Sequence, residues 1–258
     1  MIKAIFLDID GTLVSFKTHR ISQATLDALA RERSRGTKIF IATGRPLPFV
    51  DNLDQLQYAG IITVNGASCK TTDGIIINHD PICKDDLRQL VSYYEAHPFP
   101  IAFASDDEVY ITETISQQAI DVLNLLNIKV PQQRPITACL DMDIMQLVAF
   151  FTTEEEPHIM QHILPHCSAQ RWHPAFADVI NQGNNKSKGI DKVLAYYGIS
   201  LAETAAFGDG GNDISMLSHV GIGVAMGNAR DAVKQAAKYI TDTVDNDGIA
   251  QFLKKYGN

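Results

Sequence analysis

The chain has 258 residues, which is enough for one large domain or for two smaller ones. Its apolar fraction of 45% and its charged fraction of 20% are typical of a soluble globular protein. The net charge of −8 argues against a general nucleic-acid-binding protein, because such proteins need a basic face. No apolar run approaches the length of a membrane span, and charges come too early for a signal peptide.

The chain shows no sign of a metal site built from cysteine or histidine. The cysteines lie far apart in the sequence, as Cys69, Cys83, Cys139 and Cys167. Scattered single cysteines are typical of the reducing cytoplasm, where they serve as packing residues. His158, His162 and His166 recur every four residues, but no acid completes a known site, and we interpret them as a partly exposed helix face. We expect a cytoplasmic protein, monomeric or weakly homo-oligomeric, with neither a membrane nor a nucleic-acid partner.

The start of the chain alternates short apolar runs with helical patterns. Strands are expected at 3–7, 38–42 and 61–64, with one helix at 22–35 and another after Pro46. Apolar strands separated by helices are typical of a parallel sheet that is covered on both faces. The end of the chain repeats this pattern, with helices at 187–197, after Asn212, from about Asn228 and at 247–256, and strands at 204–207, 222–225 and 239–241.

The middle of the chain has a different pattern, in which strands and helices do not alternate regularly. Strands are expected at 101–104, 109–112, 146–151, 168–172 and 177–181, and helices near 84–97, 115–126 and 155–164. This mixture predicts an α+β domain inserted at 82–184. The expected fold class is therefore α/β, with a Rossmann-like parallel-sheet core domain formed by 1–81 and 185–258.

Ligands of open α/β sheets bind beyond the carboxyl ends of the strands, and the first polar cluster lies at such a position. Asp8 and Asp10 directly follow strand 3–7. Two carboxyl groups this close raise the pKa of one of them, which suits a pair with one ionised and one proton-carrying member. Asp8 is placed to attack phosphorus, and Asp10 to protonate the leaving oxygen and then to deprotonate water. The alternative is a plain turn with helix-capping acids.

Two further clusters fit the binding of a phosphate. Thr43 and Gly44 follow strand 38–42, where a hydroxyl group and the N–H groups of a helix start can hold phosphate oxygens, although a simple capped turn is the alternative. Lys188 begins the helix after the insertion and would supply a cation that offsets the charges of phosphate and Asp8. Lys186 competes with it for this role.

The last cluster is acidic and follows strand 204–207. Asp209 and Asp213 lie there among glycines that let the backbone approach a ligand, and Asn212 lies between them. Several carboxylates that converge on one point repel one another unless a cation is present. Oxygen ligands beside a phosphate favour Mg²⁺.

The order of these clusters resembles the four motifs of the haloacid dehalogenase superfamily. The position of the insertion, between the second and third motifs, is similar to that in its Cof-type hydrolases, subclass IIB. The residues that carry the resemblance are Asp8-x-Asp10-Gly11-Thr12, Thr43-Gly44-Arg45, Lys188-Gly189 and Gly208-Asp209-x-x-Asn212-Asp213, together with the closing segments at 223–229 and 247–250. The resemblance covers the whole core domain, whereas the insertion matches a cap domain mainly by its position and size.

The resemblance implies a role for each matching residue. Asp8 would be the nucleophile and Asp10 the general acid and base. Mg²⁺ would be bound by Asp8, the backbone carbonyl of Asp10 and Asp209, with Asp213 supporting these ligands from behind. The phosphoryl group would be held by Thr43, Gly44, Lys188 and Asn212. Asn65 would contact the substrate. Arg45 would either contact the phosphate or substrate or form a structural ion pair, and the two roles fit equally well.

The implied activity is that of a Mg²⁺-dependent phosphatase, a phosphoric monoester hydrolase that works through an aspartyl-phosphate on Asp8. Its expected substrates are small phosphorylated metabolites, with sugar phosphates first and flavin or pyridoxal phosphates behind them. A sugar phosphomutase is an alternative, since it shares this fold subclass and this nucleophile. A non-catalytic sensor of phosphorylated ligands is a further alternative, against which the complete set of acids argues.

Overall fold

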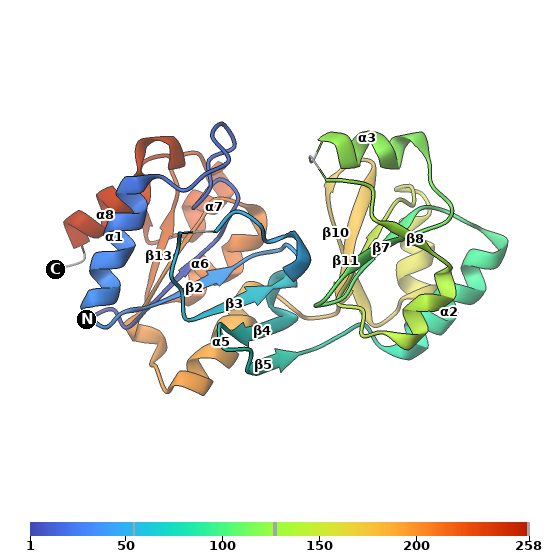
Figure 1. Ribbon diagram of the computed structural model, residues 1–258, viewed down its shortest axis with the longest axis horizontal. Helices are drawn as coiled ribbons and strands as arrows, with labels where there is room; N and C mark the ends of the chain where they lie inside the picture. Colours follow the sequence, from blue (N-terminus) through green and yellow to red (C-terminus); the bar gives the residue numbers. More distant parts are fainter. Residues whose placement is uncertain (54, 126–127, 257–258) are drawn as a thin grey trace. The chain divides into compact units, whose positions relative to one another are not determined.

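The computed structural model describes residues 1–53, 55–125 and 128–256, which divide into two compact units (Figure 1). The core unit contains Met1–Arg45, Phe49–His79 and Asn184–Asn258. The inserted unit contains Asp80–Gly183 and the short segment Pro46–Pro48. Within the described ranges, no helix combines the length and the apolar character needed to cross a membrane.

The core unit is built on one eight-stranded sheet. Its strands, in spatial order, are β14 (Tyr239–Ile240), β13 (Ile222–Ala225), β12 (Thr204–Gly208), β1 (Ala4–Leu7), β2 (Lys38–Ala42), β3 (Gly60–Thr63), β4 (Ser68–Thr71) and β5 (Ile76–His79). Neighbouring strands from β14 to β3 run parallel, and β4 and β5 pair antiparallel at one end. The predicted α/β fold with a parallel-sheet core is confirmed.

Helices cover both faces of this sheet, as its apolar strands require. All four residues of β1 are buried, with Phe6 on one face and Leu7 on the other. Phe6 belongs to the core cluster that includes apolar residues of α5 (Lys186–Tyr197), α6 (Ile214–His219) and α7 (Asp231–Ala236). On the opposite face, α8 (Gly248–Tyr256) lies beside α1 (Gln23–Ser34) and packs Phe252 edge-on against Phe207 of β12 (Figure 1).

Two local features differ from what the sequence predicts. The α-helix expected after Pro46 is a single 3₁₀ turn, Leu47–Phe49, because Pro48 has no N–H group with which to continue a helix. The polar strand β4 was not predicted, since its sequence lacks the apolar run that identifies the other strands. By contrast, α1 begins as expected at Ser22, whose side chain accepts the N–H of Thr25.

The inserted unit has a sheet of its own. Its strands, in spatial order, are β10 (Cys167–His173), β11 (Phe176–Asn181), β9 (Gln146–Ala149), β6 (Ile101–Ala104), β7 (Val109–Thr112) and β8 (Gln132–Arg134). The neighbours pair antiparallel, except that β7 and β8 run parallel. The two ends of the unit meet, because Asn181 Nδ2 donates a hydrogen bond of 2.8 Å to Asp80 Oδ1.

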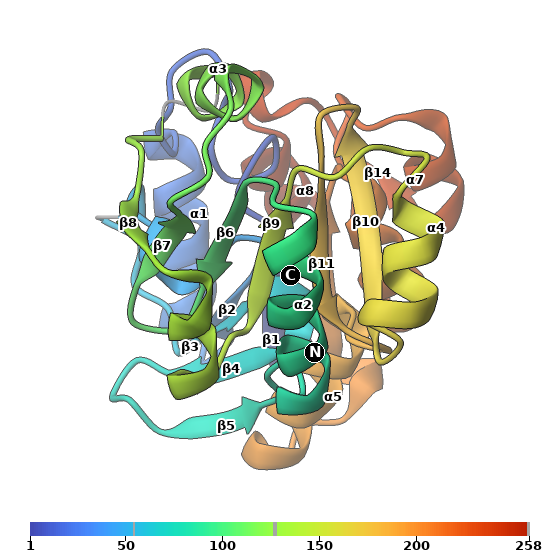
Figure 2. The ribbon, with the colours of Figure 1, turned by 90° about the vertical axis from the view of Figure 1, so that its right-hand side faces the viewer.

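Helices α2 (Lys84–Ala96) and α4 (Glu156–His158) lie against one face of this sheet (Figure 2). The helix predicted at 155–164 consists of the short α4 and a π-helical turn, Ile159–Ile163. The helix predicted at 115–126 is α3 (Gln117–Leu125), and residue 126 lies outside the described residues. The core of the unit joins Leu87 and Leu90 of α2 to apolar residues of β6, β9 and β11.

Candidate active site

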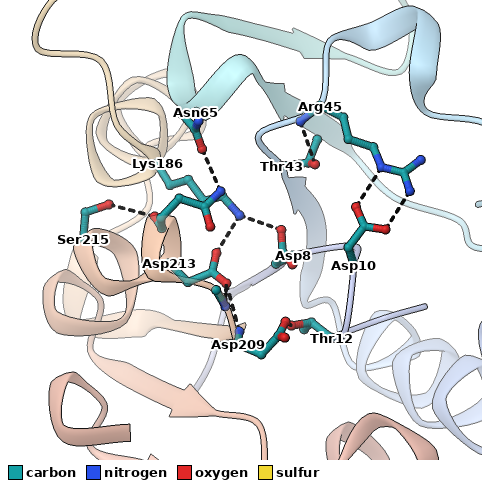
Figure 3. A network of polar contacts seen from close by, with 12 residues as sticks. Asp8, Asp10, Thr12, Thr43, Arg45, Asn65, Lys186, Asp209, Asp213 and Ser215 are labelled. Atoms are coloured by element: carbon teal, nitrogen blue, oxygen red, sulfur yellow. Dashed lines mark hydrogen bonds and ion pairs between the residues drawn. The ribbon is translucent and has the colours of Figure 1, made fainter. Parts of the chain in front are cut away.

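The fold brings three of the predicted polar clusters to one edge of the core sheet. Strands β12, β1 and β2 are direct parallel neighbours, so their carboxyl ends lie side by side. Asp209, Asp8 and Thr43 are the residues that immediately follow these three strands. Figure 3 shows their side chains converging on a common region.

A lysine ties two of the acids together at the centre of the site. Lys186 Nζ lies 2.6 Å from Asp8 Oδ1 and 2.6 Å from Asp213 Oδ1 (Figure 3). Its side chain is fully buried. Burial alone would lower the pKa of Lys186, but the charges of Asp213 and Asp8 outweigh it and raise that pKa above the ordinary value. The site therefore contains a permanent positive charge.

This finding corrects the choice of Lys188 as the phosphate-binding cation. Lys188 is exposed, whereas Lys186 occupies the position beside Asp8. Two positions in an α-helix differ by about 200° around the axis, so the two side chains leave α5 on opposite sides. The sequence does contain a signal for Lys186, because it shares a 3.6-residue stripe with Ile190 and Val193, both buried.

The backbone around α5 explains how Lys186 enters the site. Asn185 caps the helix by accepting the N–H of Lys188 at 3.0 Å, which makes Lys186 the first helical residue. One turn later, a Cβ atom on Gly189 would lie only 2.6 Å from Ile62 Cγ2 and 3.0 Å from Gly66 Cα. Glycine thus allows the start of the helix to approach the end of β3 closely enough to insert the lysine.

Two acids at this edge, Asp8 and Asp209, have raised pKa values. Burial, assisted by the charge of Asp213, raises the pKa of Asp8 to about 8, although Lys186 acts in the opposite direction. Burial also raises the pKa of Asp209 to about 6. The cluster is therefore short of positive charge.

The composition of the cluster fits a divalent cation. Asp8, Asp209 and Asp213 each offer a carboxylate oxygen, and these atoms all lie within 4.8 Å of one another. Three carboxylates against the one ammonium group of Lys186 leave a deficit of two positive charges. A hard ion such as Mg²⁺ prefers oxygen ligands of this kind.

Asp213 differs from the other two acids in how its oxygens are used. Oδ2 accepts the backbone N–H groups of Asp209 at 2.9 Å and of Gly210 at 2.8 Å, while Oδ1 faces Lys186. Its side chain is fully buried. These contacts hold the loop after β12 in place, so Asp213 organises the site from behind.

Two residues to which the sequence assigned no role orient Asp209. Thr12 Oγ1 donates to Asp209 Oδ1 at 2.7 Å, and Asn228 Nδ2 donates to Asp209 Oδ2 at 3.1 Å. Gly11 makes the approach possible: it has φ +81°, and a Cβ atom there would lie 2.3 Å from Asp209 Oδ2. Thr12 and Asn228 belong to the quoted motifs, but nothing in the sequence says that they meet.

Asp10 is engaged by Arg45. Arg45 Nε lies 2.7 Å from Asp10 Oδ2, and Arg45 Nη2 lies 2.6 Å from Asp10 Oδ1 (Figure 3). Arg45 Nη1 also donates to the carbonyl of Phe49 at 2.8 Å. This bidentate pair corresponds to the second of the two roles considered for Arg45, a structural ion pair. The side chains of Arg45 and Asp10 are each about one third exposed, so solvent reaches both of them.

The other predicted phosphate residues also lie together. Asn212 Nδ2 donates to Asn65 Oδ1 at 2.9 Å, and a Cβ atom on Gly44 would lie 3.1 Å from that same nitrogen. Thr43 Oγ1 is buried and accepts the N–H of Arg45 at 3.1 Å. Asn65 sits in a left-handed conformation with φ 50°. Such backbone strain is concentrated at functional turns.

Comparison with known proteins agrees with this geometry. A family model for haloacid dehalogenase-like hydrolases matches residues 5–253. The 5-amino-6-(5-phospho-D-ribitylamino)uracil phosphatase YitU of Bacillus subtilis (strain 168) is 33% identical over 267 residues, which cover 98% of this chain and 96% of YitU. The pyridoxal phosphate phosphatase YbhA of Escherichia coli (strain K12) is 33% identical over 274 residues, 97% of each chain. A solved structure of the subclass IIB sugar phosphatase BT4131 is 40% identical, with a TM-score of 0.86 and 99% of each chain covered.

Proposed function

Because this chain belongs to the haloacid dehalogenase-like hydrolases and is a phosphatase of that superfamily, we propose that it hydrolyses small sugar phosphates with Mg²⁺. The observation that carries the proposal is the pairing of Asp8 with Lys186 inside a cluster of carboxylates. A buried carboxylate beside a fixed cation is suited to covalent phosphoryl transfer.

In the first step, an oxygen of Asp8 attacks phosphorus in line with the ester bond. The P–O bond to the substrate breaks as the bond to Asp8 forms, which yields an aspartyl-phosphate and an alkoxide. Asp10 gives its proton to that alkoxide. In the second step Asp10 takes a proton from water, which attacks the aspartyl-phosphate, releases inorganic phosphate and regenerates Asp8.

Arg45 holds both oxygens of Asp10, so this ion pair must open before Asp10 can approach the leaving oxygen of the substrate. A phosphate dianion competes with the Asp10 carboxylate for the same guanidinium group, since Arg binds both in bidentate fashion. We infer that substrate binding draws Arg45 toward the phosphate. Arg45 would thus exchange Asp10 for the phosphate, and Asp10 would become available as the general acid only when substrate is bound.

The cation would be held by Asp8, Asp209 and the backbone carbonyl of Asp10. When bound, Mg²⁺ supplies the positive charge that offsets the phosphoryl oxygens and the nucleophile. Lys186 takes the role expected for Lys188, because its Nζ atom lies at Asp8. Thr43, Gly44 and Asn212 would donate hydrogen bonds to the remaining phosphoryl oxygens.

Sugar phosphates are the first substrate class because the sugar phosphatase BT4131 is 40% identical to this chain over 99% of its length. Pyridoxal phosphate and the phosphorylated ribitylaminouracil are the second, because YbhA and YitU act on them. A screen of inorganic phosphate release over these three classes, with Mg²⁺ or with chelator, tests the proposal. Mg²⁺-dependent release from a hexose phosphate is expected. No release from any of them would contradict it, and isomerised sugar phosphate without release would indicate a mutase.

A further inference from the structure

A second group of metal-ligating side chains lies in the inserted unit, formed by Cys83, Asp86 and His166. We propose that these three side chains bind a divalent transition-metal ion, for which Zn²⁺ is the best chemical match. The site is separate from the acid cluster of the core unit. The inference does not rest on the proposed phosphatase reaction, and it can hold or fail independently of it.

The ligand atoms already lie close together. His166 Nδ1 lies 2.8 Å from Asp86 Oδ1 and 3.8 Å from Cys83 Sγ. One ligand atom from each of the three residues lies within 4.8 Å of the others. In a tetrahedral zinc site, bond lengths of about 2.0–2.3 Å place neighbouring ligand atoms about 3.4–3.8 Å apart. The 3.8 Å separation of Cys83 Sγ and His166 Nδ1 agrees with that range, whereas the 2.8 Å contact of His166 and Asp86 is a direct hydrogen bond that must lengthen when an ion binds between them.

Two segments that are 80 residues apart in the sequence build this group. Cys83 is the residue before the first turn of α2, and Asp86 lies within that turn. His166 immediately precedes β10, and its backbone N–H donates to Asp86 Oδ2 at 3.0 Å. Because the backbone of the second segment is held by the carboxylate of the first, the imidazole is kept beside the sulfur.

Burial and charge favour a cation at this position. The Asp86 side chain is fully buried, whereas a carboxylate is rarely buried without a paired charge. Its hydrogen-bond partners are the backbone N–H and the imidazole of His166 and, at 3.5 Å, the thiol of Cys167. The His166 side chain is 66% exposed and Cys83 is half-buried, so an ion can enter from solvent.

The ligand types select the metal. Thiolate and imidazole suit Zn²⁺ and are poor partners for Mg²⁺, which takes oxygen. On binding, the Cys83 thiol releases its proton and the imidazole coordinates through Nδ1 in its neutral form. The metal would join the start of α2 to the turn before β10 and stabilise the inserted unit.

Cobalt is the probe that tests this site, since Co²⁺ bound to a thiolate gives a near-ultraviolet charge-transfer band. The full chain, freed of metal by chelation and then of chelator, is titrated with Co²⁺ in excess Mg²⁺. The core cluster offers carboxylate oxygens and cannot give this band. We expect the band to saturate at one equivalent and to bleach on addition of Zn²⁺.

The variants locate the site. C83S should abolish the band, and His166→Gln should weaken Co²⁺ binding by at least about tenfold, the lower end of what supporting contacts alone contribute. C139S is the matched control, because Cys139 is buried elsewhere in the same unit and should leave the band unchanged. His166 is exposed, so His166→Gln serves as the second variant should C83S fail to fold.

Two results would overturn the inference. One is the absence of any thiolate band at saturating Co²⁺ in a folded wild-type protein, which would leave Asp86 and His166 as a structural ion pair. The other is an undiminished band in C83S or in His166→Gln. As a readout independent of cobalt, Zn²⁺ at one equivalent in excess Mg²⁺ should raise the Tm of the wild-type protein and not that of His166→Gln.

Discussion

The ammonium nitrogen of Lys186 and the nearer carboxylate oxygen of Asp8 are 2.6 Å apart, and both side chains are shielded from solvent. Breaking a buried pair by removing one partner costs about 3–5 kcal/mol, since the other charge is left uncompensated. We therefore predict that Lys186→Met lowers the free energy of unfolding, measured in the presence of chelator, by about 3–5 kcal/mol. The same substitution should abolish phosphate release. Chemical denaturation and a phosphate-release assay measure the two effects.

Lys188→Met is the matched control, because it removes the same side chain two positions away on the exposed side of α5. Its effect on stability should stay within about 0.5 kcal/mol, as for most surface substitutions. Loss of activity in Lys188→Met with normal activity in Lys186→Met would reverse the assignment.

Substitution of Asp8 and of Asp10, the two acids after β1, should lower the rate of phosphate release by different amounts. Asp8→Asn should abolish turnover, because the amide of asparagine cannot form the aspartyl-phosphate. Asp10→Asn should lower kcat by about 10²–10⁴, the usual size of a general acid–base contribution. Steady-state phosphate release on purified variants measures both. Near-normal turnover in Asp8→Asn, or unchanged kcat in Asp10→Asn, would refute the corresponding role.

Asn228 should control the affinity for Mg²⁺ through its hydrogen bond to Asp209. Partners that orient metal ligands typically contribute about 10–100-fold to affinity. Asn228→Ala should raise the Mg²⁺ concentration needed for half-maximal phosphate release by that factor. Asn246→Ala is the control, since Asn246 is also exposed and also bonds a carboxylate, that of Asp242. Equal Mg²⁺ requirements in both variants would contradict the prediction.

Stability without divalent cations should fall as the pH rises. The pKa of Asp8 is raised to about 8 and that of Asp209 to about 6, both from 3.8, so the folded state binds protons more tightly than the unfolded chain. The stabilisation by these protons is complete below about pH 4. It is lost as the pH passes through the two raised values.

Thermal unfolding in chelator at pH 5 and pH 8 measures this loss. Each pKa unit corresponds to ~1.4 kcal/mol, and about 1 kcal/mol shifts the Tm of a chain of this size by ~2–4 °C. The Tm should therefore be several degrees lower at pH 8, and the difference should shrink in Asp8→Asn. A wild-type Tm equal at both pH values, or a difference that Asp8→Asn leaves unchanged, would contradict this prediction.

Much of the core fold could be predicted because apolar runs identify buried strands. Strands β2 and β13 have the predicted bounds, β1 begins one residue later than predicted, and β3 begins and ends one residue earlier than predicted. The strand order then explains why Asp8, Thr43 and Asp209 meet, since polar residues after adjacent parallel strands share one edge. The polar strand β4 carries no such pattern and was missed.

The sequence predicted which residues lie at the edge of the sheet better than it predicted which side chains contact one another there. Lys186 and Lys188 are equivalent by composition, and only the helical phase of α5 separates them. Whether Arg45 contacts Asp10 or a substrate depends on tertiary geometry, which spacing does not encode. Cys83 and His166 lie 83 positions apart, so the local motif spacings that identify zinc sites could not reveal that they meet.

The hydrogen bond between Asn181 and Asp80 has an evolutionary consequence. When the two ends of an inserted domain lie close together, the surrounding domain needs to span only a short distance between them. Such insertions are therefore well tolerated. Residues 80–183 can therefore diverge or be replaced as one module without moving Asp8 or Lys186. Under the proposed function, substrate preference would then change through residues 80–183 while Asp8 and Lys186 keep their contact.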